Sequence, residues 1–575
     1  MYVGGSGPGN YTTIQAAIDD SRRGDTVFVY GKTYYENLII DVSIVLRGEN
    51  KNTTIIDGYS HGSVIELTAN AITIRDFTVR GSNGEPLYVF AAIKAVKTSH
   101  HSILNNIIAH NGDTAIYLEN SHDNFISGNY IVNNPISGIF VYKSSENLIE
   151  DNVVEHSDYY DITAAIMIGD PSSTKNVVCH NTVVNTLNGI ETGHSVGNNI
   201  HNNTLQDNRD ACLLGGSLND VRDNNFIHNE EAIYAYGNNN SIVHNHIIDT
   251  VYAGIALFSN DCMVMNNDIV NSSNGIIVGK SRNYIAHNLI CSNTRSGIWL
   301  NLNEGCAFNV ITGNSICNNQ NYGIYCTKSN QNIVCYNEVH DNAIGMCAKN
   351  SSNNVINGNN FSANALSVSI INATSVNNTL FHNNFFDSNV LAFDNSTTSA
   401  WDVGYPSGGN YWSAYTGTDS DGDGIGDVSL PIPGGDNQDR YPLMSPYIKQ
   451  GAPDHPHIEG QMSGRIWKVY TYTFLTTDPD VDDVYYYIDW GDGTNSRWIG
   501  PYSSGLAVMQ VHRWKTQGTY IVRAKAKDVT GEESDWGTLS VTMPLSYDPP
   551  HFRFLDWLCE RSPYAFLILR YFLGK

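Results

Sequence analysis

The sequence predicts an all-β protein, with a right-handed parallel β-helix (a solenoid) that carries an N-terminal helical cap and is followed by a small Ig-like β-sandwich. Two observations carry this prediction. An Asn-centred motif recurs, mostly every 21 to 24 residues, through the middle of the chain, and alternating strands with Gly-Asp-Gly turns lie near the C-terminus. A chain of 575 residues is also too long for one compact core, so more than one structural part is expected.

The repeat consists of an apolar residue, two further residues, Asn, one residue and a second apolar residue, and it recurs thirteen times. A period near 22 with short β-type segments and Asn or Gly corners indicates one coil of a solenoid. Asn suits an inner corner because it tolerates a left-handed turn and its amide can bond to the same amide one coil away. We expect about seventeen coils and a ladder formed by Asn106, Asn129, Asn152, Asn181, Asn203, Asn224, Asn245, Asn267, Asn288, Asn314, Asn337, Asn359 and Asn383.

A second strand follows most of these anchors and begins with Gly or Ala, as in residues 138–141. Alternation assigns its faces. One internal stack is predicted to comprise Ile116, Ile139, Ile166, Ile190, Ile233, Ile255, Ile276, Ile298 and Ile324. The residue after each points outward, in a column that is more apolar than a solvated face.

Aromatic side chains on a flat outer face can stack on sugar rings, although a loop or a neighbouring copy of the chain would also cover them. Both interpretations stay open on the sequence. The predicted glycan- or partner-binding residues are Tyr117, Phe140, Tyr234, Trp299 and Tyr325.

Residues 11–18, ahead of the repeats, offer an N-cap hydroxyl and apolar residues at helical spacing, and residues 25–30 alternate as a strand does. We expect a short amphipathic helix that caps the open end of the coil. Without a cap, that end would expose core and unpaired strand edges.

The net charge of -25 argues against nucleic acid as a partner, because a phosphate backbone requires a concentrated Lys/Arg surface. No run of 18 apolar residues predicts a transmembrane segment, and no leader opens the chain at Met1. We expect a secreted or cell-surface protein whose signal peptide has been removed.

Ten cysteines are present, nine of them between Cys179 and Cys347, without a C-x-x-C pair. Core filling is the simplest interpretation. Cys291 and Cys317 are predicted to occupy the same position on successive coils, and so are Cys326 and Cys347. A strand spacing of about 4.8 Å permits a disulfide there without requiring one.

The opening residues 11–19, the segment 24–27 and the run 54–58 resemble the first coils of the pectin lyase-like superfamily. The Asn repeats look like the NosD-type, or carbohydrate-binding and sugar-hydrolysis (CASH), subgroup that is common on archaeal surfaces. Residues 409–413 through 439–443 are similar to the segment that closes such helices. The resemblance covers roughly residues 2–445 and implies the fold more strongly than an activity.

A second resemblance, to a PKD domain, covers about residues 459–545, where the run 487–494, His512 and residues 518–520 carry it. It implies an extracellular spacer or adhesion module. The predicted parts are the cap and first coils at 1–98, the Asn-rich repeats at 99–400, a C-terminal cap at 401–450, a linker at 451–458, the sandwich at 459–545 and an apolar tail at 546–575.

The sharpest ligand motif places carboxylates at alternate positions among glycines, and it resembles dockerin and thrombospondin-type calcium loops. Calcium requires six to eight oxygens, which this spacing can turn toward one point. Leu430 stands where an EF-hand places its bidentate Glu, so Asp436 or Asp439 would have to complete the shell. A plain polar turn is the alternative to structural calcium bound by Asp419, Asp421, Asp423, the Ile425 carbonyl and Asp427.

Paired carboxylates on adjacent coils could hydrolyse a glycoside. The weak catalytic candidates, all near one corner or the outward column, are Asp158, Asp161, Glu191, Asp210 and Glu231. A solvated acidic corner is the interpretation that we favour, because the Asn-Thr-Asp, paired Asp and Gly-His-Gly set of polygalacturonases is absent.

Four histidines precede anchor asparagines without falling on neighbouring coils, so no stacked histidine pair for a metal is expected; they are His180, His244, His287 and His382. The sequence therefore favours a non-catalytic extracellular scaffold that is archaeal in type and binds polysaccharide or copies of itself. The alternative is a polysaccharide-active enzyme.

Overall fold

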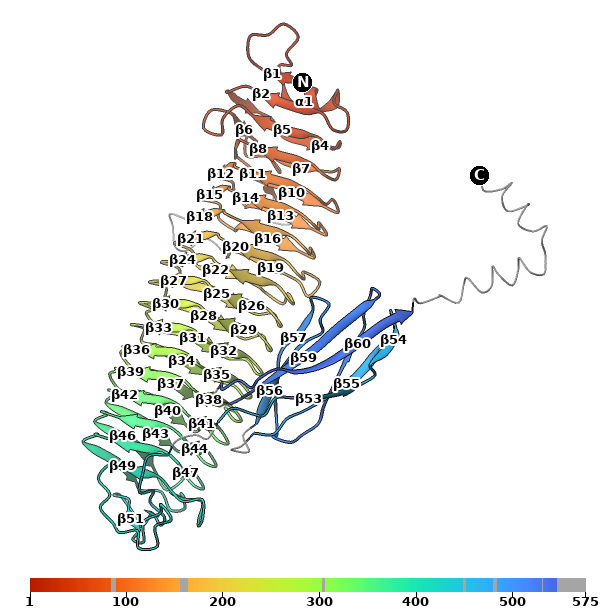
Figure 1. Ribbon diagram of the computed structural model, residues 1–575. Coiled ribbons are helices and arrows are strands. Elements are labelled where there is room, and N and C mark those ends of the chain that lie inside the picture. The colour runs from red at the N-terminus through yellow and green to blue at the C-terminus, as the bar shows by residue number, and fades with distance from the viewer. Residues whose placement is uncertain are drawn as a thin grey trace, which may run out of the picture. The chain divides into compact units, whose positions relative to one another are not determined.

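The structure is a computed structural model that describes residues 1–83, 89–155, 164–301, 306–447, 451–478, 483–529 and 531–545 (Figure 1). The chain divides into two compact units, 1–447 and 448–575. Asp158, Asp161 and the apolar tail from 546 onward lie outside the described residues. No helix among the described residues is long and apolar enough to cross a membrane.

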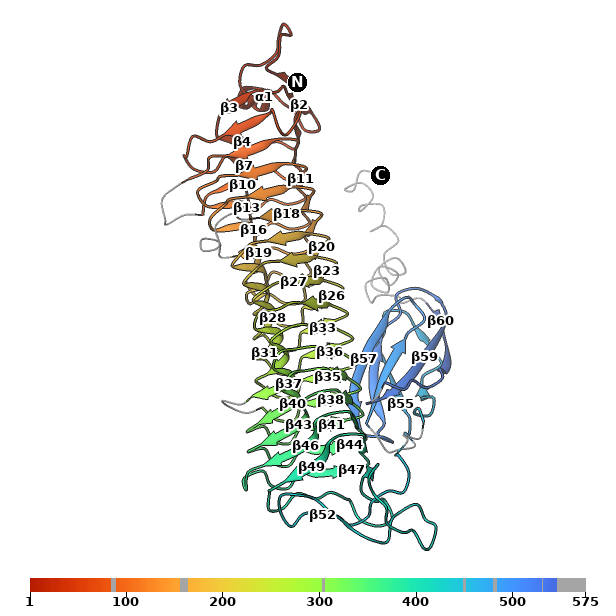
Figure 2. The same ribbon diagram turned by 90° about the vertical axis from the view of Figure 1, so that its left-hand side faces the viewer.

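The first unit is a parallel β-solenoid in which each coil contributes a short strand to each of three sheets, as predicted (Figures 1 and 2). Apart from β1, which pairs with β2, and β50, which pairs with β48, each strand pairs in parallel with the strand three places along the chain, and the described strands make sheets of 17, 17 and 16 members. We call them sheets A, B and C.

Sheet A consists of β1 Tyr2–Val3, β2 Thr26–Val29, β5 Val45–Gly48, β8 Thr73–Arg75, β11 Ser102–Leu104, β14 Phe125–Ser127, β17 Leu148–Glu150, β20 Val177–Cys179, β23 Asn199–His201, β26 Asp220–Arg222, β29 Ser241–Val243, β32 Met263–Met265, β35 Tyr284–Ala286, β38 Val310–Thr312, β41 Ile333–Cys335, β44 Val355–Asn357 and β47 Thr379–Phe381. Sheet B consists of β3 Thr33–Tyr35, β6 Ile55–Asp57, β9 Thr78–Arg80, β12 Ile107–Ala109, β15 Tyr130–Val132, β18 Val153–Glu155, β21 Thr182–Val184, β24 Thr204–Gln206, β27 Asn225–Ile227, β30 His246–Ile248, β33 Asp268–Val270, β36 Leu289–Cys291, β39 Ser315–Cys317, β42 Glu338–His340, β45 Asn360–Ser362, β48 Asn384–Phe386 and β50 Tyr411–Trp412.

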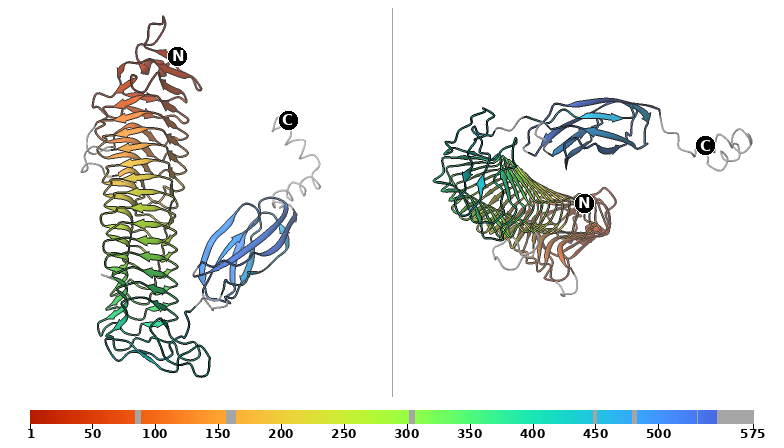
Figure 3. Two further views of the ribbon diagram at one scale, coloured as in Figure 1. Left: turned by 60° about the vertical axis from the view of Figure 1, so that its left-hand side comes forward. Right: turned by 90° about the horizontal axis from the view of Figure 1, so that it is seen from below.

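Sheet C carries the longer strands and the predicted outward column. Its members are β4 Leu38–Ile40, β7 Ile65–Leu67, β10 Ala91–Val96, β13 Thr114–Glu119, β16 Ser137–Tyr142, β19 Ala164–Gly169, β22 Asn188–Glu191, β25 Asp210–Leu214, β28 Glu231–Ala235, β31 Ala253–Leu257, β34 Asn274–Val278, β37 Ser296–Asn301, β40 Tyr322–Thr327, β43 Ile344–Lys349, β46 Leu366–Ile371 and β49 Val390–Asp394. The left panel of Figure 3 shows these coils in succession along the unit.

The predicted Asn ladder runs unbroken along the corner between sheets A and B. From Asn106 onward, each side-chain Nδ2 donates to Oδ1 of the anchor on the next coil at 2.9 to 3.1 Å, through Asn383 to Asn410. Each anchor is at most 1% exposed. The ladder ends on Asp439, whose Oδ2 accepts from the backbone N–H of Asn410 at 2.8 Å and from Trp412 Nε1 at 2.8 Å.

Two further Asn series, which the sequence reasoning missed, line other corners. One includes links from Asn124 to Asn147 and from Asn332 to Asn354. Another includes the link from Asn319 to Asn342. Buried amides therefore satisfy the turn backbone at more than one corner of the coil.

The predicted internal stack is confirmed. All nine of its isoleucines are completely buried, and the register of sheet C aligns them from coil to coil. Cys212 fills the position between Ile190 and Ile233. The stack makes the solenoid interior continuous and apolar.

One of the two cysteine predictions holds and the other is wrong. Cys291 and Cys317 are register partners with Cα atoms 4.7 Å apart, and a disulfide joins them. Cys326 instead faces Ala348 and Cys347 faces Tyr325, because these two cysteines are offset by one position along their strands. Cys326 therefore points into the core while Cys347 joins the outward column, and both are free thiols.

A short helix, α1 (Ile14–Asp19), lies at the first coils and buries Ile14 and Ile18 in the solenoid core. The expected N-cap hydroxyl is not used, since Thr13 makes no side-chain cap bond. The carboxylate of Glu36 accepts from the backbone N–H groups of Ile14 and Gln15 instead, at 2.9 and 3.0 Å. A carboxylate from the next coil thus replaces a local cap.

Within the second unit, two sheets enclose a separate aromatic core that includes Tyr472, Trp490 and Trp514. One sheet comprises β53 His457–Gly460, β55 Tyr470–Leu475 and β58 Val508–His512, and the other comprises β54 Ser463–Arg465, β56 Val484–Asp489, β57 Asn495–Tyr502, β59 Gly518–Asp528 and β60 Gly537–Leu545. The pairing is antiparallel except between β54 and β60, which are parallel.

Replacing one rung of the Asn ladder is expected to destabilise the solenoid strongly. Asn245→Ala removes the acceptor of the Asn224 side chain and of the Asn224 backbone N–H, and it removes the donor to the Val221 carbonyl, all of them buried. Unpaired buried polar groups cost about 1 to 3 kcal/mol each, so we expect a loss of about 4 kcal/mol in urea unfolding. The exposed Asn321→Ala is the control and should change stability by less than about 0.5 kcal/mol. Equal losses in both variants would contradict the ladder's role.

Candidate functional site

The outward column of sheet C exists and brings the predicted aromatic residues into register. Tyr117 lies beside Phe140 with ring centroids 5.5 Å apart, and Trp299 stacks on Tyr325 at 6.4 Å. Tyr234 lies between these pairs along the column and stacks on Phe258 at 5.3 Å. The column is therefore two aromatic clusters and one central ring, not a continuous stripe.

Side chains of the outward column cover part of the outer face of sheet C. Ala256 and Ile277, which point outward, are 0% and 1% exposed because Tyr234 and Trp299 pack against them. Tyr117 is 5% exposed and donates its hydroxyl to Glu119 at 3.2 Å. Intrachain packing thus accounts for part of the apolar column, while the rings of Tyr252 and Phe258 remain exposed.

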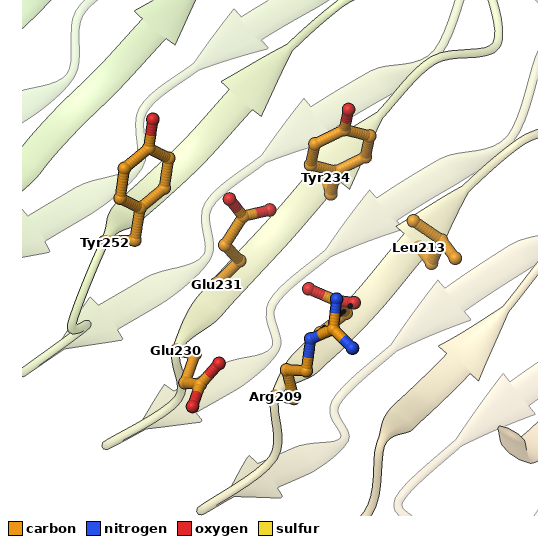
Figure 4. A pocket seen from close by; sticks show the side chains of 7 residues that line it. Arg209, Leu213, Glu230, Glu231, Tyr234 and Tyr252 are labelled. Carbon is orange, nitrogen blue, oxygen red and sulfur yellow. Dashed lines mark ion pairs between the residues drawn. The ribbon is translucent and has the colours of Figure 1, made fainter. Parts of the chain in front are cut away.

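A pocket of about 510 Å³ opens on sheet C over β25, β28 and the turn before β31. It is lined by Arg209, Asp210, Leu213, Glu230, Glu231, Tyr234 and Tyr252. Figure 4 shows the Glu231 carboxylate between the two tyrosines, with Arg209 and Glu230 at the corner. The pocket combines two of the weak catalytic candidates with one predicted binding aromatic.

The sheet register brings carboxylates from successive coils together. Asp210 pairs with Glu231 across β25 and β28, and with Asn188 across β22 and β25. Asn188 Nδ2 donates to Glu191 Oε2 at 2.9 Å, which holds a third carboxylate on the coil before Asp210. Arg209 Nε lies 3.7 Å from Asp210 Oδ2, and among the described residues Arg209 is the only cation that lines the pocket.

These carboxyl groups differ in their affinity for protons. Burial and the nearby negative charge of Asp210 together raise the pKa of Glu231 to about 7, although Arg209 opposes the rise. Burial also raises the pKa of Asp210, against Arg209, and it raises the pKa of Glu191, against the hydrogen bond from Asn188. Near neutral pH the pocket can therefore hold both a protonated and an ionised carboxyl group on adjacent strands about 4.8 Å apart.

Sequence reasoning found Asp210, Glu231 and Tyr234 but missed Tyr252 as a lining residue. Tyr252 lies in the turn before β31, where its backbone N–H donates to the Glu230 carbonyl at 2.9 Å. Its position beside the acidic corner of the previous coil was the available signal. Asp158 and Asp161 lie outside the described residues, and Glu191 is outside the pocket lining.

The predicted calcium loop brings three of its carboxylates together. One oxygen each of Asp419, Asp421 and Asp423 lies within 4.8 Å of the others. Asp419 also accepts from the backbone N–H groups of Gly422 and Gly424, at 2.7 and 3.0 Å. Ile425 donates its N–H to Asp423 Oδ1 at 2.8 Å.

Asp427 and Asp439 are engaged elsewhere. Asp427 Oδ2 accepts from the backbone and the hydroxyl of Ser420, at 2.9 and 2.7 Å. Asp439 is completely buried at the end of the Asn ladder, so the suggestion that it completes a calcium shell is wrong. Burial raises the pKa of Asp439 to about 6.

A second cluster of metal-ligand type lies on the outer face of sheet A. Glu150, Cys179 and His180 each place one ligand atom within 4.8 Å of the others, and Cys179 Sγ lies 3.9 Å from Glu150 Oε2. Sequence reasoning considered only His180 among these. The register of β17 and β20, which pairs Glu150 with Cys179 across a 29-residue coil, was hidden by the length of that coil.

The NosD family model, described as "Periplasmic copper-binding protein (NosD)", matches residues 19–242 and 217–417, which is more than half of the chain. The comparison with curated proteins gave no match.

Several solved structures are similar to parts of the chain. The PKD domain of an M14-like peptidase from Thermoplasmatales archaeon SCGC AB-540-F20 is 52% identical over 17% of this chain and 100% of that chain, with a TM-score of 0.17. The A-module of the Azotobacter vinelandii mannuronan C-5 epimerase AlgE6 is 15% identical over 67% of this chain and 94% of that chain (TM-score 0.31). The catalytic domain of a GH87 alpha-1,3-glucanase, in complex with nigerose, is 15% identical over 60% and 67% (TM-score 0.36).

Copper, which the family description names, can be tested against the two clusters of ligand type. The Asp419 loop offers oxygens alone, which suit calcium or magnesium. The cluster at Cys179 offers a thiol and an imidazole, the donors that copper and zinc prefer. The donor set at Cys179 therefore fits copper.

The family model matches more than half of the chain, and the chain folds as a parallel solenoid. This chain therefore belongs to the NosD family of β-helix proteins.

Proposed function

We propose that this protein binds a polysaccharide outside the cytoplasm, along the outer face of sheet C, and that it does so without cleaving the polymer. The observation that carries the proposal is the pocket that Asp210 helps to line and in which the Glu231 carboxylate lies between Tyr234 and Tyr252 (Figure 4). Sugars are recognised by carboxylates that accept from hydroxyl groups and by aromatic rings that contact the apolar ring face. This pocket offers both kinds of contact.

The charge of the pocket limits the class of sugar. Three carboxylates and one guanidinium line it, and the chain carries a net charge of -25. A uronate or sulfated polymer would meet like charge there, so we expect a neutral or amino sugar. Trp299 and Tyr325, three and four strands of sheet C beyond Tyr234 in the same outward column, offer further stacking positions to an extended polymer.

The disulfide between Cys291 and Cys317 supports an oxidising location, since disulfides are rare in the cytosol. The family description, which names the periplasm, agrees with a location outside the cytoplasm. Binding to copies of the same chain through the outward column would be a scaffold function of the same face.

Hydrolysis of the bound polysaccharide is the second candidate function. Its supporting observation is the register pairing of Asp210 with Glu231, together with the raised pKa of Glu231. Glu231 would act as the general acid and Asp210, beside Arg209, as the ionised partner. This candidate requires that both groups reach the same glycosidic bond.

We also propose that calcium binds at Asp419, Asp421 and Asp423, with the Ile425 carbonyl and Asp427 as the remaining predicted ligands. The gathered carboxylates of the first three residues support this proposal. The loop lies in the C-terminal cap, where Ile425 pairs with Leu443, so the ion would have a structural role.

Polysaccharide binding can be tested with a panel of neutral, amino-sugar and acidic polysaccharides on which the retention of the purified chain is measured. We expect retention by a neutral or amino polymer, and Tyr234→Ala should weaken it by about tenfold, which corresponds to about 1.4 kcal/mol of lost stacking. Tyr35→Ala, an exposed ring on sheet B, is the matched control and should bind as the wild type does. Retention that is unchanged in Tyr234→Ala would contradict the proposed site, and release of reducing ends that is lost in Glu231→Gln would establish hydrolysis.

The pKa of Glu231 makes a prediction about stability. Its pKa is about 7 in the folded chain against an ordinary value of 4.5, so the folded state binds the proton more tightly. The free energy of unfolding should therefore fall as the pH rises from about 4.5 to about 7, and Glu231→Gln should lack this fall. Allowing for the partial exposure of the group, we expect a difference of about 1 to 2 kcal/mol between the two proteins in urea unfolding. Identical pH profiles would refute the raised pKa.

Removal of calcium should lower the melting temperature of the wild-type chain. Asp421→Asn removes one charge with little change of shape, so this variant should melt lower than the wild type in calcium and respond less to a chelator. Asp41→Asn, an exposed position in the first coils, should keep the full response. A wild-type melting curve that the chelator leaves unchanged would remove the calcium site from this account.

A further inference from the structure

The outer face of sheet A carries a group of side chains that polysaccharide binding on sheet C does not use. Glu150, Cys179 and His201 follow one another in register across β17, β20 and β23, and His180 comes directly after Cys179. The rings of His180 and His201 lie 6.0 Å apart. Two imidazoles, a thiol and a carboxylate from three successive coils thus share one patch.

The geometry points to a new metal site, and we propose that Glu150, Cys179 and His180 bind a thiophilic transition-metal ion of the Cu⁺ or Zn²⁺ class. In a tetrahedral site with such ligands, neighbouring donor atoms lie roughly 3.3 to 3.8 Å apart. The Cys179 sulfur is 3.9 Å from the Glu150 carboxylate, and all three donor atoms lie within 4.8 Å of one another. Small side-chain rotations bring them into range.

His201 provides an independent observation at the same patch. Its Nδ1 atom is buried and has no hydrogen-bond partner among the described residues. A buried ring nitrogen without a partner is unusual in a folded protein, whereas a metal ion would satisfy it. The ring of His201 lies 6.0 Å from that of His180, outside the group of three close donor atoms, so His201 would have to move toward the ion to become a fourth ligand.

Access to the patch also suits metal binding. Cys179 is 4% exposed, Glu150 is half-buried and His180 is exposed, so an ion can enter from solvent while the thiol stays protected. Metal binding by His180 would break its contact with Asn202, because a ring nitrogen of His180 lies 3.3 Å from Asn202 Nδ2. Glu150 and the neighbouring Asp151 place negative charge beside Cys179 and His180, which favours a cation there, whereas Arg222 lies in register with His201.

The matched control is built into the repeat. Cys335 occupies the equivalent last position of a sheet A strand, β41, but its register partners are Thr312 and Asn357. The residue after it is Tyr336, where the site has His180. Cys335→Ser therefore removes a thiol from the same structural position without touching the proposed ligands.

The test is a competition titration of the metal-free full chain with Zn²⁺, and separately with Cu⁺ held by ascorbate, against a chromophoric chelator. We expect one equivalent of tightly bound metal in the wild type and in Cys335→Ser. Cys179→Ser and Glu150→Gln should each weaken binding by more than about tenfold, the loss typical of altered metal shells. With Co²⁺ as an optical probe, the thiolate charge-transfer band should disappear in Cys179→Ser alone.

No uptake by the wild type, or equal affinity in the wild type and Cys179→Ser, would overturn the proposal. Glu150→Gln keeps the test decisive if Cys179→Ser fails to fold, because Glu150 lies at the surface of the strand and packs no core. Preference between Zn²⁺ and Cu⁺ in the titration then assigns the ion. If Cys335→Ser also loses metal uptake, binding depends on thiols in general and the proposed site is wrong.

Discussion

The hydrogen bond from one asparagine amide to the same amide on the next coil is the interaction on which the rest of this structure depends. A parallel solenoid must turn its backbone sharply several times in each coil, and every turn leaves polar groups next to an apolar interior. At the corner between sheets A and B, the Asn106 to Asn410 ladder satisfies these groups with one side chain per coil, and Asp439 ends it with a carboxylate that has acceptors only. The turn is thereby fixed at the same point of every coil, whatever the length of the loop between anchors.

Fixed turns make the register of the sheets predictable, and the register assembles the two proposed sites. Asp210 and Glu231 are 21 residues apart in sequence yet adjacent across β25 and β28. Glu150 and Cys179 are 29 residues apart and equally adjacent across β17 and β20. Because inward positions are occupied by the isoleucine stack, chemical variety is confined to outward positions, and each outward column can acquire a separate site.

The sequence predicted what is local and periodic. The anchor ladder, the isoleucine stack and the outward column all follow from the Asn spacing and strand alternation, and the Cys291–Cys317 pair follows from the same spacing. Features outside the period were missed or wrong. The offset of Cys326 from Cys347 depends on where one strand starts, and the role of Asp439 depends on the irregular end cap. The pairing of Glu150 with Cys179 spans an unusually long coil, and the pocket at Tyr252 depends on a turn residue.

The acidic pocket of sheet C is proposed to receive a sugar ring between Tyr234 and Tyr252. The most direct measurement is a crystal structure of the full chain with an oligosaccharide cut from whichever polysaccharide retains it. This account predicts a sugar ring in contact with Tyr234 and hydroxyl groups that donate to Asp210 and Glu231. An oligosaccharide bound only to the C-terminal sandwich, or to another sheet of the solenoid, would contradict it.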